Sequence, residues 1–232
     1  MNIFAILLLA GSSTRFAISD KCLYQLEGAP VFSYSLKTFL NIQEITHIIC
    51  VYRDDVQRDE INKYISNDDF FSKFSHKIYF VQGGSERKFS VFNALTYINN
   101  TFDVGEDDIV SIHDGARPFV TQNKVEQLLN TAKQKGSAVL IHTITDTIVT
   151  EHEIQSDIST KFQSNLTYID RNNLIGIETP QVFHFSKLFD GYISAIEKNL
   201  QVTDDSGVYP GKIFFVENSE NNRKITFKED VK

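Results

Sequence analysis

The feature that most constrains this chain is a regular alternation of short apolar runs with longer amphipathic stretches. Apolar runs lie at residues 3–10, 47–52, 77–81, 108–112 and 137–144, and segments with helical spacing lie at 30–41, 54–65, 86–99 and 123–135. Alternation of this kind predicts β-α-β units, and these require a mainly parallel sheet with helices on its faces. We therefore expect an α/β fold that binds its ligands at the carboxyl ends of the strands.

The first apolar run, residues 3–10, predicts a strand covered by helices on both faces. Small residues follow the run, as they do in secretion signals. However, no Lys or Arg precedes it, and it is short for the apolar region of a signal. We also find no stretch near the roughly 18 apolar residues that a membrane span needs, and we expect no membrane partner.

The alternation breaks between about 145 and 170, where β-branched and polar residues mix without a helical period. This segment predicts a hairpin-like arm on a single domain, residues 1–232. An arm of this kind cannot bury both of its faces against its own domain, so a partner subunit is expected. A helix at 186–199 and strands at 212–216 and 224–227 are predicted to complete the chain.

The overall charge is acidic, with 23 Lys and Arg against 30 Asp and Glu and a formal net charge of -7. This balance argues against nucleic acid and anionic membranes as partners, because both require a positive field over a whole face. Any anion must instead be bound locally. The two cysteines, Cys22 and Cys50, form no disulfide framework and lack metal-ligand spacing, which favours a reducing, cytoplasmic location.

The first apolar run ends in a turn of small residues, Gly-Ser-Ser-Thr at 11–14, followed by Arg15 and then Lys21. The turn matches neither the G-x-G-x-x-G pattern of dinucleotide sites nor the P-loop pattern. Its backbone amides can still face an anion, with two cations nearby. The alternative is an ordinary β-α turn with two solvated cations.

A second turn, GGSER at 83–87, follows the third apolar run and supplies two glycines that permit close backbone approach. Ser85 and Ser90 can donate or accept hydrogen bonds at a base edge. The alternative is that this stretch only begins a helix, with Ser85 as its N-cap.

A third turn, HDGARPF at 113–119, places Asp114 and Arg117 where the carboxyl edge of a sheet meets a ligand. A plain turn ended by Pro118 is the alternative. A His, an Asp and an Arg around Gly115 are an unusual choice for a plain turn, and this composition favours a binding site.

Eight motifs occur in the order found in one enzyme family: LAGSSTRF with Lys21, GGSER with Ser90, HDGARP, DT at 146–147, DRNNL at 170–174, TPQVF at 179–183, TDD at 203–205 and Lys224 in RKIT. On these motifs the chain resembles the 2-C-methyl-D-erythritol 4-phosphate cytidylyltransferases over nearly its whole length. The resemblance implies a Rossmann-like nucleotidyltransferase domain, a β-arm that builds a homodimer, and CTP with Mg²⁺ as cofactor. It also implies a step in isoprenoid precursor synthesis by the non-mevalonate route.

The resemblance also assigns roles to individual residues. It implies that the triphosphate meets Ala10, Gly11, Arg15 and Lys21, and that cytosine and ribose meet Gly84, Ser85, Ser90 and Gly115. The polyol-phosphate side would comprise Asp114, Arg117, Thr147, Arg171, Thr203 and Lys224. Thr147 and Arg171 are expected to reach in from the neighbouring subunit. Arg15, Lys21 and Lys224 are the expected catalytic cations, and the metal ligands are left unassigned.

The first turn departs from the family pattern at several positions. Leu8 and Leu9 replace Pro and Ala, Ser13 replaces a Gly, and Phe16 replaces a Met. Around the lysine, Asp20 stands in place of Pro, and Cys22 in place of Gln. The carboxylate of Asp20 either lowers the effective charge of Lys21 toward phosphate or is merely solvated.

Three other functions remain open at this point. A ribitol-5-phosphate cytidylyltransferase shares the GGS, HD-x-x-RPF, DTIV and TPQ motifs, although DRNNL favours methylerythritol phosphate. A binding module that retains CTP and has lost turnover is the second, suggested by the altered first turn. The third, an α/β domain without a nucleotide, leaves six Lys and Arg residues in the motif regions without a function.

Overall fold

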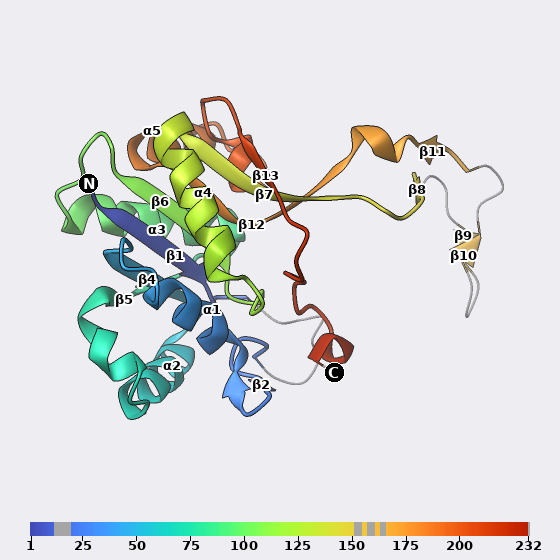
Figure 1. The fold of residues 1–232 in the computed structure, drawn as a ribbon. Coiled ribbons are helices and arrows are strands. Elements are labelled where there is room, and N and C mark those ends of the chain that lie inside the picture. The colour runs from blue at the N-terminus through green and yellow to red at the C-terminus, as the bar shows by residue number, and fades with distance from the viewer. Residues whose placement is uncertain (12–19, 151–154, 157–160, 163–165, 232) are drawn as a thin grey trace.

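The computed structural model describes residues 1–11, 20–150, 155–156, 161–162 and 166–231. Its centre is a seven-stranded sheet in the order β13-β7-β12-β6-β1-β4-β5 (Figure 1). The strands are β1 (Ile3–Leu8), β4 (His47–Tyr52), β5 (Ile78–Gln82), β6 (Ile109–Asp114), β7 (Ser137–Thr143), β12 (Ile175–His184) and β13 (Phe215–Glu217). Strand β12 is antiparallel to β6 and β7, and the other pairings are parallel. The predicted α/β, mainly parallel class is confirmed.

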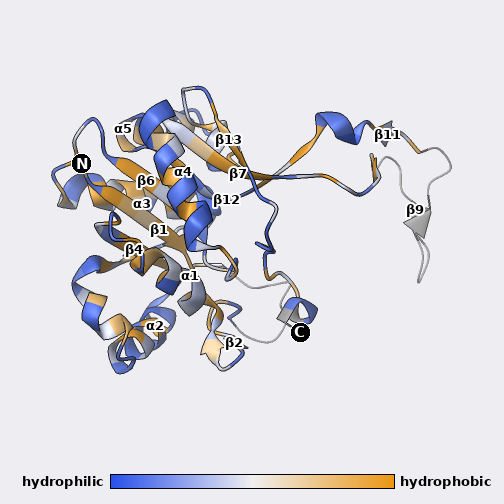
Figure 2. Cartoon of the chain, in the orientation of Figure 1, coloured by the Kyte–Doolittle hydropathy of each residue, from blue (hydrophilic) through white to orange (hydrophobic). Residues whose placement is uncertain are grey.

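Helices cover both faces of the sheet, so the molecule has three layers. The helices are α1 (Val31–Leu40), α2 (Asp55–Asn67), α3 (Arg87–Thr101), α4 (Gln122–Lys135) and α5 (Phe185–Glu197). Alternate residues of β1 enter two separate cores, one with α1, α2 and α4 and the other with α3 and α5. The unbroken apolar run at the start of the chain is therefore a strand buried on both faces, as predicted, and the central strands are the most hydrophobic elements in Figure 2.

Local signals set the ends of the helices. The side chain of Asp54 accepts a hydrogen bond from Gln57 N at the start of α2, and Thr121 caps α4 in the same way. Helix α4 ends at Gly136, which has a φ of 92°, a left-handed conformation that glycine adopts without strain. These caps fix where each helix meets the sheet edges.

Short elements complete the described chain. They are β2 (Gln25–Leu26), β3 (Ala29–Pro30), β8 (Ile148–Val149), β9 (Gln155–Ser156), β10 (Lys161–Phe162) and β11 (Tyr168–Ile169), with the 3-10 helices η1 (Phe71–Lys77), η2 (Arg171–Asn173), η3 (Asp205–Gly207) and η4 (Lys228–Val231). Strand β2 pairs with β3 to form a small hairpin before α1.

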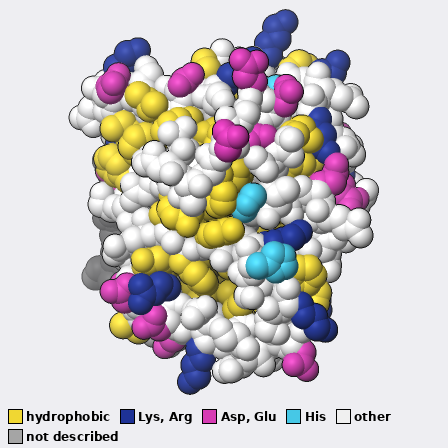
Figure 3. Space-filling view, turned by 90° about the vertical axis from the view of Figure 1, so that its left-hand side faces the viewer, with side chains coloured by type: hydrophobic (Ala, Val, Ile, Leu, Met, Phe, Trp, Pro, Cys, Tyr) yellow, Lys and Arg dark blue, Asp and Glu magenta, His cyan; other side chains and the backbone are white. Residues whose placement is uncertain are grey.

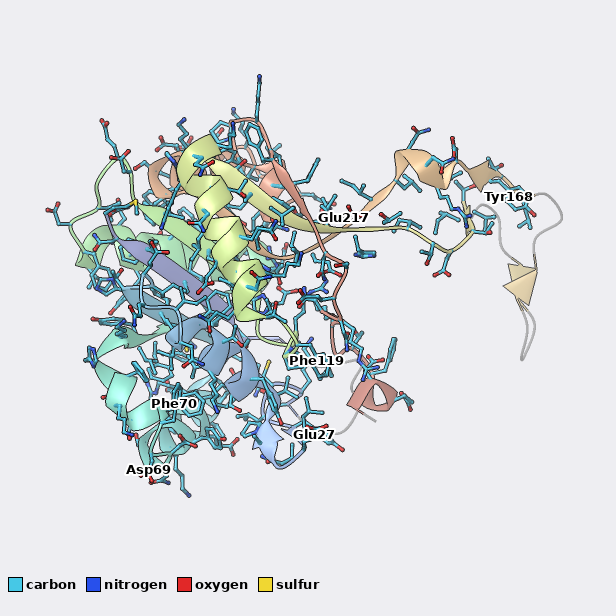
Figure 4. All side chains as sticks on the ribbon, in the orientation of Figure 1. Glu27, Asp69, Phe70, Phe119, Tyr168 and Glu217 are labelled. Atoms are coloured by element: carbon cyan, nitrogen blue, oxygen red, sulfur yellow. The ribbon has the colours of Figure 1, made fainter. Side chains whose placement is uncertain are left out.

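A narrow arm leaves the sheet where β7 ends and returns where β12 begins (Figure 1). On it β8 pairs antiparallel with β11, and β9 with β10, which agrees with the hairpin-like arm predicted for about 145–170. Tyr168 lies on this arm, well away from the sheet (Figure 4). The extent of the single domain, residues 1–232, stays a prediction.

Three expectations for the second half of the chain need correction. The sequence did not indicate β12, a central strand of the sheet, and the strand expected at 212–216 is observed as β13 at Phe215–Glu217. The strand expected at 224–227 is wrong. Instead Ile225 is buried against Leu26 and Val31, and its N–H donates to the carbonyl of Ala116 at 2.8 Å. Phe119, labelled in Figure 4, packs against the same small cluster.

The surface shows no broad positive region on the face opposite the arm. There the Lys and Arg side chains are interspersed with Asp and Glu (Figure 3). Within the described residues, no helix combines the length and the apolar character needed to cross a bilayer.

Gly191, in the middle of α5, provides a test of how tightly this layer packs. A Cβ atom at this position would lie 2.1 Å from the carbonyl oxygen of Val208, in the segment that carries η3. We expect Gly191→Ala to lower the free energy of unfolding by about 1–3 kcal/mol, because a backbone oxygen cannot rotate away. Urea unfolding measures this. Gly207→Ala is the control, since no atom lies within 4 Å of its added Cβ. Equal stability of the two variants would contradict the expectation.

Candidate active site

A cleft of about 460 Å³ opens at the carboxyl ends of β1, β4, β5 and β6. It lies at the sheet edge where the strand pattern predicts a ligand. Of the residues assigned to the nucleotide, Ala10, Gly11, Gly84, Ser85 and Ser90 line it. Lys21, Lys224 and Asp114 line it as well. Residues from the first turn, the second turn, the HDGARPF turn and the C-terminal segment are thus brought together in one cavity.

The first turn begins where β1 ends. The N–H of Leu9 donates to Val51 O at 2.9 Å, which continues the pairing of β1 with β4. The chain then turns, and the N–H of Gly11 donates to Leu9 O at 2.9 Å. A Cβ atom at Gly11 would lie 3.4 Å from Lys21 Cε, so the lysine side chain runs along the glycine. Arg15 and the rest of the turn, residues 12–19, lie outside the described residues.

The second turn packs directly against the first. A Cβ atom at Gly83 would lie 2.8 Å from both Ala10 Cβ and Ser90 Oγ, so only glycine lets the two turns approach this closely. The N–H of Gly84 donates to Ser90 Oγ at 3.1 Å, which fixes the turn against the start of α3. Glu86 is the residue at the N-cap position of that helix, so the alternative in which Ser85 caps it is wrong, and Ser85 is exposed at the cleft.

Asp114, at the end of β6, lies between two cations. Its Oδ2 accepts a hydrogen bond from Lys224 Nζ at 2.7 Å, and its Oδ1 lies 3.4 Å from Arg87 Nε. Burial alone would raise the pKa of the Asp114 carboxyl, but Arg87 and Lys224 outweigh burial and hold this pKa well below its usual range. Asp114 is therefore an ionised acceptor that faces the cleft.

Arg87 is itself held from behind. Its Nη1 and Nη2 donate to the two carboxylate oxygens of Asp205 at 2.8 and 2.6 Å, a bidentate pair. Asp205 is completely buried and also accepts from the hydroxyl of Tyr192 at 2.5 Å. Because the guanidinium is anchored in this way, it reaches the cleft in one fixed orientation.

His113, next to Asp114 at the end of β6, contacts β12 through Thr179 and the far end of the HDGARPF turn through Arg117. One ring nitrogen, Nε2, lies 3.0 Å from the carbonyl of Arg117, and a carbonyl can only accept, so Nε2 carries the hydrogen. Nδ1 then accepts from the hydroxyl of Thr179 at 3.1 Å, and that hydroxyl accepts from Asp114 N at 3.0 Å. Burial lowers the pKa of His113 to about 4, so the ring is neutral and serves to position Asp114.

Of the predicted site residues that the structure describes, five do not line this cleft. Gly115 lies beneath it, where an added Cβ would meet Leu9 Cδ2 at 2.2 Å, and Arg117 Nη1 donates to Asn222 O at 2.8 Å. Thr203 is exposed near the Asp205 segment. Thr147 and Arg171 are exposed on the arm, where Arg171 Nη1 donates to Thr145 O at 2.5 Å. The ligand roles of all five stay predictions.

Two lining cations, Arg53 and Arg87, were not assigned to the site from the sequence. Arg87 lies within the GGSER motif itself, so its position in the turn was an available signal. Arg53 directly follows the apolar run 47–52, and the rule that ligands bind at the carboxyl ends of strands would have identified it.

Asp20 is not merely solvated, and its effect on the charge of Lys21 stays a prediction. Its side chain is only 9% exposed, and it pairs with Arg53 at 2.7 Å rather than with solvent. Cys22 is buried and free, and burial raises the pKa of its thiol to about 12, so it is not a thiolate beside Lys21 at neutral pH.

The predicted cofactor, Mg²⁺, can be tested against the donors in the cleft. Glu86 and Asp114 are carboxylates of its lining. Across the described parts of the chain, no three His, Cys, Asp or Glu side chains gather into a metal-binding group. Mg²⁺ usually keeps several waters and binds through one or two carboxylates plus substrate phosphates. The donors therefore fit an ion that arrives with a triphosphate.

Comparisons with known proteins agree over the full length of the chain. A profile of the 2-C-methyl-D-erythritol 4-phosphate cytidylyltransferase family matches residues 3–232. The enzyme of that name from Fusobacterium nucleatum is 34% identical over 235 residues, which cover 98% of this chain and 93% of the relative. The one from Thermosipho africanus is 31% identical over 233 residues, covering 99% and 95%.

Solved structures are similar in the same way. The 2-C-methyl-D-erythritol 4-phosphate cytidylyltransferase of Francisella tularensis matches with a TM-score of 0.74 and 25% identity, over 100% of this chain and 97% of that one. The 4-diphosphocytidyl-2C-methyl-D-erythritol synthase of Anaerococcus prevotii has a TM-score of 0.78 at 24% identity, with 99% and 94% covered, and supports the fold.

The buried, neutral ring of His113 predicts a specific pH dependence of stability. Its pKa falls from 6.5 to about 4 on folding. The stability that it contributes is therefore complete above pH 6.5 and is lost as the pH falls toward 4, by on the order of 3 kcal/mol. We expect His113→Gln to flatten the fall in unfolding free energy over this range, measured by urea titration at each pH. The exposed His76→Gln is the control, and an unchanged slope in His113→Gln would contradict the assignment.

Proposed function

The chain belongs to the 2-C-methyl-D-erythritol 4-phosphate cytidylyltransferase family, and from this premise we propose that it transfers CMP from CTP to 2-C-methyl-D-erythritol 4-phosphate. The products are 4-diphosphocytidyl-2-C-methyl-D-erythritol and pyrophosphate. This is a nucleotidyltransferase reaction of isoprenoid precursor synthesis.

The observation that carries the proposal is the set of cations in the cleft. Lys21, Arg53, Arg87 and Lys224 line it, in a chain whose formal net charge is -7. An acidic protein that gathers four cations at the carboxyl ends of its strands fits a polyanionic ligand bound there. Asp20, Asp205 and Asp114 pair with Arg53, Arg87 and Lys224 and fix these cations before any ligand arrives.

The chemistry needs little beyond this arrangement. A phosphate oxygen of the acceptor forms a bond to the α-phosphorus of CTP, while the bond from that phosphorus to the bridging oxygen breaks and pyrophosphate leaves. The attacking oxygen is already anionic, so no general base is required. The buried, neutral His113 is consistent with this, because it is committed to two hydrogen bonds inside the fold. Fixed cations that meet the charge on the α-phosphate and on the leaving group supply the catalysis.

Each side of the cleft has a proposed task. Lys21 and Gly11 meet the triphosphate, with Arg15 from the same turn, and the GGSER turn with Ser90 surrounds the base and ribose. Asp114 accepts from acceptor hydroxyls, and Lys224 contacts phosphate. Mg²⁺, when bound with the triphosphate, supplies Lewis-acid stabilisation of charge on the phosphate oxygens. Glu86 is the lining carboxylate that would meet the ion, since both oxygens of Asp114 face Lys224 and Arg87.

Methylerythritol phosphate is preferred over ribitol phosphate as the acceptor. The relatives that match nearly the whole chain are named 2-C-methyl-D-erythritol 4-phosphate cytidylyltransferases. The sequence also contains the DRNNL motif, which favours this acceptor. A CTP-binding protein without turnover is less well supported, because Lys21 and Lys224 both line the cleft.

We further propose that the chain works as a homodimer joined through the arm. The arm and the adjoining start of β12 expose large apolar side chains, among them Val149, Leu166, Tyr168, Ile169, Ile175 and Ile177, and their burial by a second copy would remove this surface from water. Arg171 and Thr147 lie on the arm, outside their own cleft, where they would complete the acceptor site of the partner. The buried, free state of both cysteines supports a reducing, cytoplasmic location.

Release of pyrophosphate tests the reaction directly. With Mg²⁺, CTP and a panel of polyol phosphates, we expect methylerythritol 4-phosphate to give the fastest turnover. We also expect CTP to exceed ATP and GTP by about 10²-fold or more, because the small GGSER turn fits a pyrimidine. Activity with ribitol 5-phosphate alone, or equal rates with all nucleotides, would refute the assignment.

Subunit mixing tests the shared site. We expect Arg171→Ala and Lys21→Ala each to lose most activity, since one preordered cation is worth roughly 10²- to 10³-fold in rate. After subunit exchange about half of the dimers are hybrids with one intact site each, so the mixture should recover about a quarter of the wild-type rate. A mixture that exchanges subunits, shown by mass spectrometry, and stays inactive would place Arg171 outside the partner's site.

A further inference from the structure

We propose that Gln57 is a positioning residue for Lys21, and that it acts through the carboxylate of Asp20. The inference rests on the proposed function, because it takes Lys21 as a cation that meets the triphosphate. The geometry that carries it is a buried polar cluster of Asp20, Arg53 and Gln57, which we name the clamp.

Gln57 is the centre of the clamp. It lies in the first turn of α2 and is only 1% exposed. Its Nε2 donates to the carbonyl of Leu9 at 3.0 Å and to Asp20 Oδ2 at 2.6 Å. Its Oε1 accepts from the N–H of Arg53 at 2.7 Å. A single amide therefore ties the residue after β1, the far end of the first turn and the residue after β4.

Asp20 transmits this restraint to its neighbour in the chain. Its Oδ1 accepts from the N–H of Cys22 at 2.9 Å, and its Oδ2 also accepts from Arg53 Nη1 at 2.7 Å. Cys22 is buried, and its carbonyl accepts from Phe32 N at 3.0 Å. The backbone of Lys21 is thus held between two residues that cannot move independently of the clamp.

Arg53 restrains the surface along which the lysine side chain lies. Its Nη1 is 3.4 Å from the carbonyl of Gly11, and its Nε donates to Asp54 Oδ2 at 2.8 Å, at the cap of α2. Gly11 is the residue whose added Cβ would lie 3.4 Å from Lys21 Cε. The same turn of α2 therefore restrains both the backbone of Lys21 and Gly11, the residue along which its side chain lies.

The clamp also settles the electrostatics beside the phosphate site. A carboxylate at position 20 without a cationic partner would repel a triphosphate, because like charges repel more strongly in a poorly solvated cleft than in water. Here the Asp20 carboxylate accepts three hydrogen bonds, one of them from a guanidinium. The charge of Asp20 is compensated by Arg53, so the carboxylate adds less negative potential beside the phosphate site.

A coupled-variant experiment tests the inference. We expect Gln57→Leu to lower kcat by about 10²-fold, because a displacement of roughly 1 Å at a reacting group has a cost of this size. The KM for the polyol phosphate should be unchanged, since Asp114 and Lys224 lie outside the clamp. Asp20→Asn keeps the shape of the side chain and loses its charge, so its kcat should lie between those of the wild type and Gln57→Leu. This variant carries the test if Gln57→Leu does not fold.

The decisive measurement repeats both substitutions in a Lys21→Ala background. If Gln57 and Asp20 act through Lys21, they cost nothing further there; if their losses are undiminished, the inference is wrong. Arg58→Gln is the matched control, because it breaks ion pairs with Asp55 and Asp59 on the exposed side of the same helix. It should leave kcat unchanged, and a loss there would attribute the effect to α2 in general.

Calorimetric titration with CTP and Mg²⁺ separates this inference from the proposed function. The same coupling should be visible in the CTP dissociation constant, with Gln57→Leu weakening binding in the wild-type background and not in Lys21→Ala. If the wild-type protein binds CTP and releases no pyrophosphate, the proposed reaction fails while the clamp is still decided by binding. If Gln57→Leu binds CTP as the wild type does and keeps its kcat, the clamp has no positioning role.

Discussion

The parallel register of β1 with β4 and β6 is the constraint on which the site depends. Leu8 lies level with Val51 on one side and with Asp114 on the other, so three neighbouring strands end at one edge of the sheet. The first turn, Arg53 and Asp114 therefore begin within reach of one another. An antiparallel neighbour delivers its carboxyl end to the opposite edge, and β12 accordingly contributes to this edge from its interior, with Thr179.

Carboxylates that stand behind or beside the cleft order its cations. Asp205 holds Arg87, Asp20 and Asp54 hold Arg53, and Asp114 holds Lys224. Burying such pairs brings little net stability, because desolvation offsets most of their attraction. Their effect lies in geometry, since cations fixed before the substrate arrives need no reorganisation when charge develops. An acidic chain can therefore bind a polyanionic ligand, because several of its carboxylates are paired with the cations of the cleft.

Much of the fold could be predicted because its central strands are apolar on both faces and its helices are amphipathic. Strand β12 was missed because IGIETPQVFH contains Gly and Pro, and its pairing shifts register between Ile177 and Gln181. The stretch at 224–227 has strand-like composition, but Ile225 fills a small separate cluster beside Leu26. The composition of a segment predicts that its apolar residues are buried, but it does not predict which residues they pack against.

The site could be predicted as far as motifs and strand ends reach. The turns at 11, 84 and 114 fall in the cleft because each follows a parallel strand. The pairing of Asp20 with Arg53 joins residues 33 positions apart, and that of Arg87 with Asp205 joins residues 118 apart. No periodicity records such contacts, which exist only once the sheet has formed.

The antiparallel course of β12 has a consequence for how the chain can change in length. Because Thr143 of β7 is paired with Ile175 of β12, the chain leaves and re-enters the sheet at adjacent points. The cost of closing a loop between two fixed, neighbouring ends rises only slowly with its length. Residues could therefore be added to or removed from the outer arm while the register of the sheet and the walls of the cleft stay as they are, so that the reach of the arm is free to vary independently of the chemistry.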